Sequence, residues 1–391
     1  MPGTNAVLRD MKINSLVAVL FGLSLPPALA QTAPPLAFSG AEGFGQFTTG
    51  GNAGEVVHVT TLADAGPGSF RDAVSRPNRL VVFDVSGIIR LKSNVAVNNH
   101  LTLAGQTAPG DGVMLYGRST SFSGGHDVIV RYLRFREGIA GDKGKCAVNL
   151  SGGDHMIFDH CSIEWGRWDC LGLTKDSHDI TFQYCLIGEG VDPQRFGSLS
   201  DSAVNITYTH NLWINNQSRN PKAKGNIQYV NNVVYNWGVC GLVGGHSGAV
   251  HLLDAIGNYF IAGPNSGHAF TGEYKDTDHL YQRDNYVDLG KTGQLNGRLV
   301  TSADFGKGPE APTLEAEPTM GSLAHVTVEP AATALANVVA HAGCSLHRDS
   351  VDARLIDAVS SYGLRGKIVE SEADAGGIGE IPELHAPAQK P

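Results

Sequence analysis

The stretch SRNPKAKGN, residues 218–226, concentrates positive charge in a chain that is acidic overall. Arg219, Lys222 and Lys224 stand around Pro221, whereas the 391 residues together carry a formal net charge of -9. Arginine binds carboxylates through a planar fork, and lysine binds them through a compact charge. The stretch therefore predicts a point at which the protein binds an anionic ligand.

Acidic residues and one further arginine are expected on the same strip of surface. When the repeats described below are superposed on their first strands, seven residues fall at one height: Asp142, Asp169, Asp192, Arg195, Arg219, Lys222 and Lys224. Spaced carboxylates beside cations suit an anionic ligand held partly through calcium, which takes oxygen ligands. The pattern predicts the lysines and Arg195 as ligand-binding residues, and Asp169, Asp192 and Asp142 as metal ligands.

The elements that must position these residues are visible as an internal repeat. Eight short β-like runs share one pattern: 101–106, 128–133, 156–161, 180–185, 206–211, 227–232, 253–258 and 280–285. Their starts are separated by 27, 28, 24, 26, 21, 26 and 27 residues. A period in the twenties indicates a solenoid, in which each repeat buries its apolar face by stacking on its neighbours.

Two columns of the repeat predict how the coils stack. The sixth position carries a row of asparagines, at 211, 232, 258 and 285, whose amides can bond from coil to coil. Because asparagine tolerates left-handed backbone, we expect this row to form a repeated corner. The third position carries Phe158, Phe182, Tyr208 and Tyr229, which are expected to stack inside.

These features predict an all-β fold, a right-handed parallel β-helix with three strands per coil. A leucine-rich repeat has a similar period but needs a leucine pattern that the chain lacks, and a propeller needs longer repeats. We expect the β-helix over 38–300, with a capping helix in 66–75. Residues 301–391 are expected to form a linker and helices, at 330–343 and 348–363, that pack back on the solenoid.

The N-terminus and composition indicate an exported protein. Lys12, the apolar run 16–25 and the sequence Ala28-Leu29-Ala30 are typical of a signal peptide, which we place at 1–30 with a mature start near 31. The six cysteines are compatible with an oxidising compartment. The acidic balance argues against nucleic acid as the partner, and no later run is long enough to span a membrane. A monomer is the expected state.

Several motifs together resemble those of polysaccharide lyase family 1, the pectate lyases of the pectin-lyase superfamily. The similar segments cover almost all of the mature chain: 41–45, 66–74, 104–112, 128–138, 159–165, 218–222, 231–238, 258–264 and 348–356. The resemblance implies an exported lyase that cleaves a polyuronate such as pectate by β-elimination. In that reaction a base removes the C5 proton of a uronate, and the C4 glycosidic oxygen leaves.

The resemblance also implies residue roles. The arginine of the family's R-x-P motif, here Arg219, is the implied base, and Lys224, five positions later, is the implied substrate contact beside Lys222. A guanidinium ordinarily stays protonated. Two possibilities therefore stay open: a minority neutral form of Arg219 acts at alkaline pH, or Arg219 stabilises charge while water or hydroxide takes the proton.

The chain departs from the family pattern at the implied calcium ligands. Cys146 stands where the family has an aspartate, and Trp168 stands where a second acid is expected, so that Asp169 is the acid left at that spot. A weakened or rebuilt calcium site, the loss of that site, and a different uronate polymer all remain open.

Two other functions remain possible. A polygalacturonase-like glycoside hydrolase needs paired carboxylates at fixed separation, and segment 168–173 only faintly resembles its acid motif. A non-catalytic β-helix that binds polysaccharide is compatible with the missing calcium acids, because a fold does not fix a function.

Overall fold

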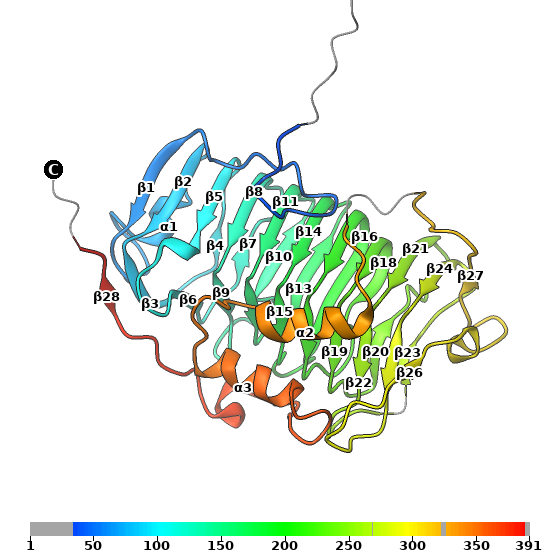
Figure 1. Cartoon of the computed structure of the whole chain (residues 1–391). Coiled ribbons are helices and arrows are strands. Elements are labelled where there is room, and N and C mark those ends of the chain that lie inside the picture. Colours follow the sequence, from blue (N-terminus) through cyan, green and yellow to red (C-terminus); the bar gives the residue numbers. More distant parts are fainter. Residues whose placement is uncertain (1–33, 268, 322–325, 388–391) are drawn as a thin grey trace, which may run out of the picture. The chain divides into compact units, whose positions relative to one another are not determined.

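The repeats form a parallel β-solenoid (Figure 1). The computed structural model describes residues 34–267, 269–321 and 326–387, so the expected signal peptide lies outside the described residues. Parallel strands stack in register along the body, as in the pairing of Phe158 with Val130 on one side and Phe182 on the other. The predicted parallel β-helix is confirmed.

The solenoid consists of three faces, each made of stacked parallel strands. The first face contains β1 (Glu55–Val59), β2 (Arg79–Phe83), β5 (Leu101–Ala104), β8 (His126–Arg131), β11 (Asp154–Asp159), β14 (His178–Gln183), β21 (His251–Ile256), β24 (Asp278–Arg283) and β27 (Thr313–Leu314). The second face contains β4 (Val95–Ala96), β7 (Thr120–Ser121), β10 (Val148–Ser151), β13 (Asp169–Thr174), β20 (Cys240–Val243) and β23 (Ala269–Gly272). Two long strands, β16 (Phe196–Thr209) and β18 (Lys222–Val230), continue from the second face into the first.

The third face contains β3 (Val85–Arg90), β6 (Val113–Tyr116), β9 (Arg134–Arg136), β12 (Ser162–Glu164), β15 (Leu186–Gly188), β17 (Leu212–Ile214), β19 (Val233–Tyr235), β22 (Tyr259–Ile261) and β25 (Tyr286–Asp288). Two antiparallel strands end it, because β28 (Leu384–His385) pairs with β3 and β26 (Arg298–Leu299) pairs with β25. In chain order each coil runs from the first face to the third and then, through a connecting loop, to the second.

The asparagine row forms the predicted ladder. The side-chain amides of Asn211, Asn232 and Asn258 donate to the carbonyl oxygen of the next asparagine at 3.0, 3.2 and 2.8 Å. The left-handed backbone, however, belongs to the residue before each ladder position, for example His210 at φ 54° and Asn231 at φ 55°. The expectation that the asparagines themselves are left-handed is wrong, because their amides serve the ladder while the preceding residue turns the corner.

The aromatic column fills the interior as expected. The rings of Phe158, Phe182 and Tyr208 stack with centroids 4.7 and 5.5 Å apart, and the ring of Tyr229 meets that of Tyr208 edge-on at 6.4 Å. All four side chains are fully buried. The interior therefore consists of continuous columns of like residues, so each coil depends on its neighbours.

The N-terminal helix α1 (Phe70–Ala73) is shorter than the predicted 66–75. Gly66 and Gly68 adopt φ values of 102° and 76°, which a helix cannot contain, and the Ser69 hydroxyl accepts from the Asp72 amide as the N-cap. Phe70 is buried with its ring 6.2 Å from that of Phe83, so the helix packs on the first rungs of the solenoid.

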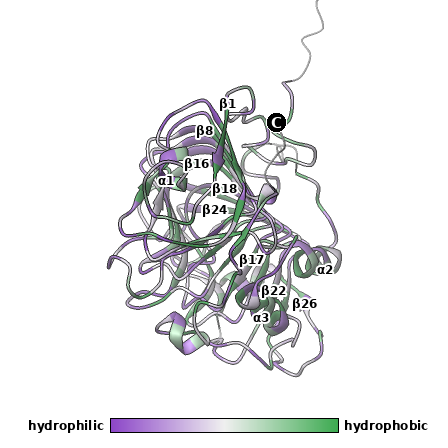
Figure 2. Ribbon diagram, turned by 90° about the vertical axis from the view of Figure 1, so that its left-hand side faces the viewer, coloured by the Kyte–Doolittle hydropathy of each residue, from purple (hydrophilic) through white to green (hydrophobic). Residues whose placement is uncertain are grey.

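Two C-terminal helices pack on the third face, as the sequence predicts (Figures 1 and 2). Leu335 and Val338 of α2 (Ala331–His341) and Leu355 of α3 (Ser350–Val359) are buried in one cluster with strand residues of β17 and β19. Within the expected linker, β27 pairs with β24 and adds a rung to the first face.

A buried charge network fixes α3 to the solenoid. The guanidinium of Arg136 donates to Glu164 at 2.6 Å, to Asp352 at 2.8 Å and also to Asp349, and all four side chains are excluded from solvent. Asp352 also accepts from the Ser162 hydroxyl at 2.8 Å. The family-like segment 348–356 thus contributes two carboxylates that anchor the helix rather than groups exposed to a ligand.

Candidate active site

The basic stretch lies where the connecting loops pass from the third face to the second. Asp169 at the start of β13 pairs with Phe196 at the start of β16, and Phe196 forms a bridge with Ser218. Arg219 follows directly, with a left-handed φ of 62°. Because three successive coils are in register here, residues far apart in the sequence meet at one spot.

Arg219 forms an ion pair with Asp169. Its Nη1 donates to both carboxylate oxygens, at 3.3 and 3.2 Å, and its guanidinium lies over the Phe196 ring, 4.2 Å from the centroid. The Asp169 side chain is 1% exposed and that of Arg219 is 21% exposed. The buried acid and the ring therefore fix a guanidinium that still reaches solvent.

The burial of Asp169 has an electrostatic consequence. Burial raises the pKa of this carboxyl to about 6, although the charges of Arg219 and Lys222 act in the opposite direction. At neutral and alkaline pH the group is ionised and pairs with Arg219. Below about pH 6 it takes up a proton, and the attraction to the guanidinium weakens.

Lys222 and Lys224 continue the positive charge along β18. Their partly exposed side chains alternate with buried Ala223, which places both on the outer side of the strand. Lys222 pairs with Glu273 at 3.1 Å and Lys224 with Asp201 at 3.1 Å. Both ammonium groups are thus held on the outer surface by carboxylates of other coils, Asp201 one coil before Lys224 and Glu273 two coils after Lys222.

Arg195 and Asp192 lie together in the connecting loop before β16. Their side chains form an ion pair at 3.6 Å and are partly exposed. The carbonyl of Arg195 accepts from the amide of Gln217 at 2.7 Å, which joins this loop to the one that carries Arg219. We call Arg195, Arg219, Lys222 and Lys224 the basic strip.

The three predicted metal ligands do not form one group. Asp169 pairs with Arg219, Asp192 pairs with Arg195, and Asp142 lies in an exposed loop. In the described part of the chain, the triads of possible ligands whose atoms lie within 4.8 Å of one another include none of these acids.

Cys146 does not replace the missing ligand. Burial, together with the nearby charge of Asp169, raises the pKa of the Cys146 thiol far above its usual range, so the group stays protonated. Trp168 is 38% exposed and offers no oxygen. The donors at this site therefore do not fit a preformed oxygen cage for calcium.

Some contacts at the site escape sequence reasoning. The ring of Phe196 supports the guanidinium of Arg219. The available signal in the sequence is that this aromatic residue directly follows Arg195. Glu273 and Asp201, the partners of the two lysines, carry no signal in the sequence, because the pairing depends on how the coils stack.

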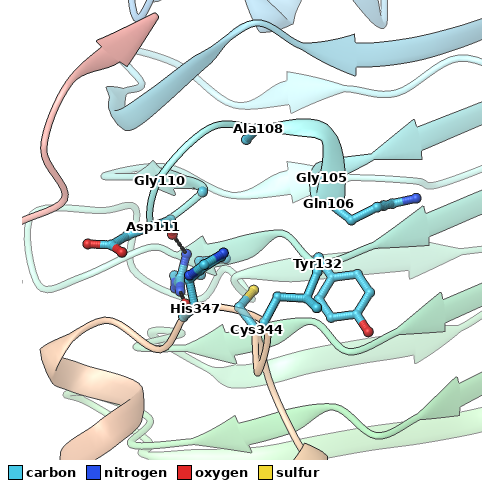
Figure 3. Close-up of a pocket in the computed structure, with 11 residues that line it drawn as sticks. Gly105, Gln106, Ala108, Gly110, Asp111, Tyr132, Cys344 and His347 are labelled. Carbon is cyan, nitrogen blue, oxygen red and sulfur yellow. Dashed lines mark hydrogen bonds between the residues drawn. The ribbon is translucent and has the colours of Figure 1, made fainter. Parts of the chain in front are cut away.

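A separate small pocket lies between the family-like segment 104–112 and the chain after α2 (Figure 3). Arg134 lines it and donates to the Asp111 carbonyl at 2.7 Å and to the carbonyl of His347. None of the predicted site residues lines this pocket. Its contacts join the C-terminal extension to the solenoid.

The fold is that of the pectin-lyase-like β-helices. The chain resembles the solved structure of Jun a 1, the major allergen from cedar pollen, with a TM-score of 0.56, 17% identity and coverage of 78% of this chain and 92% of that one. It also resembles the thermostable pectate lyase PL 47, with a TM-score of 0.56, 15% identity and coverage of 79% and 98%. These likenesses establish the fold.

Sequence relatives establish the family. The chain is 41% identical to the "Probable pectate lyase C" of Aspergillus flavus over 95% of its own length and 87% of the relative's. It is 40% identical to the protein of the same name from Emericella nidulans, over 92% and 84% of the two chains. No family model matches. The chain belongs to the pectate lyase family, and is therefore a polysaccharide lyase.

Proposed function

We propose that the protein cleaves pectate, the polymer of galacturonate, by β-elimination at the basic strip. The observation that carries the proposal is the Arg219 guanidinium, fixed by a buried carboxylate yet open to solvent, with Lys222 and Lys224 beyond it. Relatives that cover most of the chain are named probable pectate lyases, which supports this substrate class.

The proposed reaction breaks the C5–H and C4–O bonds and forms one C4–C5 double bond. The C5 proton of a uronate goes to a base, its electron pair forms the C4–C5 double bond, and the C4 glycosidic oxygen leaves and is protonated by solvent. Arg219 acts at the reacting centre, either as that base or as the cation that stabilises the developing charge while hydroxide takes the proton. Asp169 is a positioning residue, because its carboxylate acts through the guanidinium of Arg219.

The remaining cations bind the polymer. Lys222 and Lys224 stand two residues apart on one strand, so their ammonium groups can meet carboxylates along an extended polyuronate. Arg195 adds a forked donor on the neighbouring loop. Glu273, Asp201 and Asp192, which now pair with these cations, are partly exposed and can be displaced by substrate carboxylates.

The oxygen donors near Arg219 give little support to a requirement for calcium. The reaction above uses this chain's own cations, and any calcium would have to be held largely by substrate. We further infer that the protein is exported, on the strength of its signal-peptide motif, and that it acts as a monomer.

The deciding experiment assays purified protein on polygalacturonate, methyl-esterified pectin and alginate, each with added calcium and with chelator. We expect the ultraviolet absorbance of an unsaturated uronate to appear with polygalacturonate. Steady release of reducing ends without that absorbance would indicate a hydrolase, and tight binding without either signal would indicate a non-catalytic protein. Activity that survives in chelator would show that the basic strip suffices.

A further inference from the structure

A second row of reactive side chains follows the edge where the second face turns into the first. It consists of four histidines and three aspartates: His100, His126, His155, His178, Asp127, Asp154 and Asp179. We call this row the histidine ladder. It is separate from the basic strip, since Asp169 begins β13 on the second face whereas His178 begins the following strand, β14, on the first.

The histidine rings of successive coils meet edge to face. Ring centroids of successive histidines lie 5.2, 5.2 and 5.8 Å apart, from His100 through His126 and His155 to His178. The strands that carry them are in register, because Asp154 pairs with His126 of β8 and with His178 of β14. The spacing of the ladder is thus the spacing of the solenoid itself.

The aspartates converge on the imidazole nitrogens. The Nδ1 atoms of His126 and His155 both contact Oδ1 of Asp154, the latter at 2.6 Å. One coil further on, Nδ1 of His178 lies 2.8 Å from Oδ2 of Asp179. A left-handed φ of 49° at His155 interrupts the alternation of the strand and brings two consecutive side chains, Asp154 and His155, to one point.

Two overlapping groups meet the geometry of a metal site. His126, Asp154 and His155 form one, and His155, His178 and Asp179 form the other, each with ligand atoms within 4.8 Å of one another. In a tetrahedral zinc site the ligands lie about 2.0–2.1 Å from the metal, and hence about 3.4 Å from one another. Small side-chain rotations therefore suffice to close either group around an ion.

We propose that the histidine ladder binds a divalent transition-metal ion of the zinc class, with His155 as the ligand common to both groups. Imidazole nitrogen and carboxylate oxygen suit zinc, nickel, copper and cobalt, whereas calcium takes oxygen ligands. In the first group the ion binds Nδ1 of His126 and His155, each neutral imidazole then carries its one ring proton on Nε2, and water completes the coordination. Because each group takes its ligands from two adjacent strands, β8 and β11 or β11 and β14, an ion bound in either group joins two successive coils.

The site is open to ions from solvent. The side chains of His126, His155 and His178 are 45%, 51% and 43% exposed, so no part of the fold must open for metal to enter. The proposal does not depend on the lyase reaction, since none of the ladder residues contacts the basic strip in the described hydrogen bonds and ion pairs.

The test uses tag-free, chelator-treated protein and the metal ions alone. Zinc binding is measured by titration calorimetry, cobalt binding by visible absorption, and stability by thermal unfolding with and without zinc. His155→Asn removes the shared ligand while retaining a residue that tolerates left-handed backbone. His279→Asn is the matched control, because its imidazole has a single carboxylate partner, Glu315 at 2.6 Å, at similar exposure.

We expect the wild-type protein and the His279→Asn variant to bind zinc alike and to unfold at higher temperature in its presence. In His155→Asn, zinc affinity should fall at least about ten-fold and the thermal shift should disappear. Unchanged affinity in His155→Asn, or a loss of binding in His279→Asn, overturns the proposal. Unchanged lyase activity and circular dichroism of His155→Asn establish that the variant is folded.

Discussion

The guanidinium of Arg219 donates from one nitrogen to both carboxylate oxygens of Asp169, a buried acid fifty positions earlier in the chain. The acid that the family resemblance implies as a calcium ligand is here paired with the proposed catalytic arginine. The buried carboxylate of the site is paired with an arginine, and the other basic residues add positive charge around it. A metal site would instead need several unpaired carboxylates.

Arg219→Lys should abolish elimination while leaving polyuronate binding nearly intact. The substitution keeps the positive charge, but an ammonium cannot reproduce the planar guanidinium that lies over the Phe196 ring while it is bonded to Asp169. Initial rates from unsaturated-product absorbance and affinity by calorimetry separate the two effects. A variant that turns over at the wild-type rate would remove Arg219 from the mechanism.

Activity should fall as the pH drops through about 6, because Asp169 then takes up a proton and loosens its hold on Arg219. Asp169→Asn should lower kcat across the alkaline range and flatten this acidic limb of the profile. Asp284→Asn, at an exposed position, serves as the control and should leave the profile unchanged. An acidic limb that persists in Asp169→Asn assigns it to another group.

The same carboxyl should make the protein less stable at neutral pH. Its pKa is raised from 3.8 to about 6 on folding, so the native state holds the proton more tightly than the unfolded chain does. The contribution to the free energy of unfolding is present below about pH 4 and is lost as the pH rises to about 6, by up to about 3 kcal/mol at 1.4 kcal/mol per pKa unit. Denaturant unfolding of wild type and Asp169→Asn at both pH values measures this difference.

Lys222→Ala and Lys224→Ala should raise KM more than they lower kcat. Each removes a charge that binds substrate carboxylates away from the reacting bond, and the loss should shrink at high ionic strength, where such attractions are screened. Lys307→Ala, at an exposed position outside the strip, is the control. Equal falls in kcat at saturating substrate would instead assign the lysines to the reacting centre.

Asn232→Ala should destabilise the protein by about 3 kcal/mol or more, because it leaves several buried partners unsatisfied. The Asn232 side chain accepts from the amide nitrogen of Asn211 and donates to Asn258 and to the Tyr208 carbonyl. Asn52→Ala, at an exposed position, should change stability by less than about 0.5 kcal/mol. Denaturant unfolding of the two variants gives the comparison, and equal effects would contradict a stabilising ladder.

Asp352→Asn should cost about 3–5 kcal/mol and loosen α3, since it breaks a fully buried charge network around Arg136. Asp357→Asn, on the same helix, removes a partner of Arg365 in a pair that is more than half exposed, and should cost less than about 1 kcal/mol. Hydrogen exchange over α3 distinguishes the two. Similar protection in both variants would show that apolar packing alone holds the helix.

The spacing of the repeats is sufficient to predict the architecture. A solenoid stacks equivalent positions of successive coils, so a column such as Asn211, Asn232, Asn258 and Asn285 is already legible as a spacing. The amphipathic periods of α2 and α3 likewise predicted helices with one face to bury. The basic strip could be read as well, because all of its cations lie close to the repeat position of Arg219.

Which charged side chains form pairs depends on the folded arrangement of the loops. Coil lengths vary from 21 to 28 residues, and this variation shifts the loops, so the sequence could align Asp169 with Arg219 but could not distinguish an ion pair from a metal ligand. The histidine ladder is not evident in the sequence for the same reason, since its members are separated by 26, 29 and 23 residues and become a column only when the strands are in register. The spacing of the repeats determines how the strands of successive coils stack. The partner of each side chain depends on the path of the loop that connects the strands.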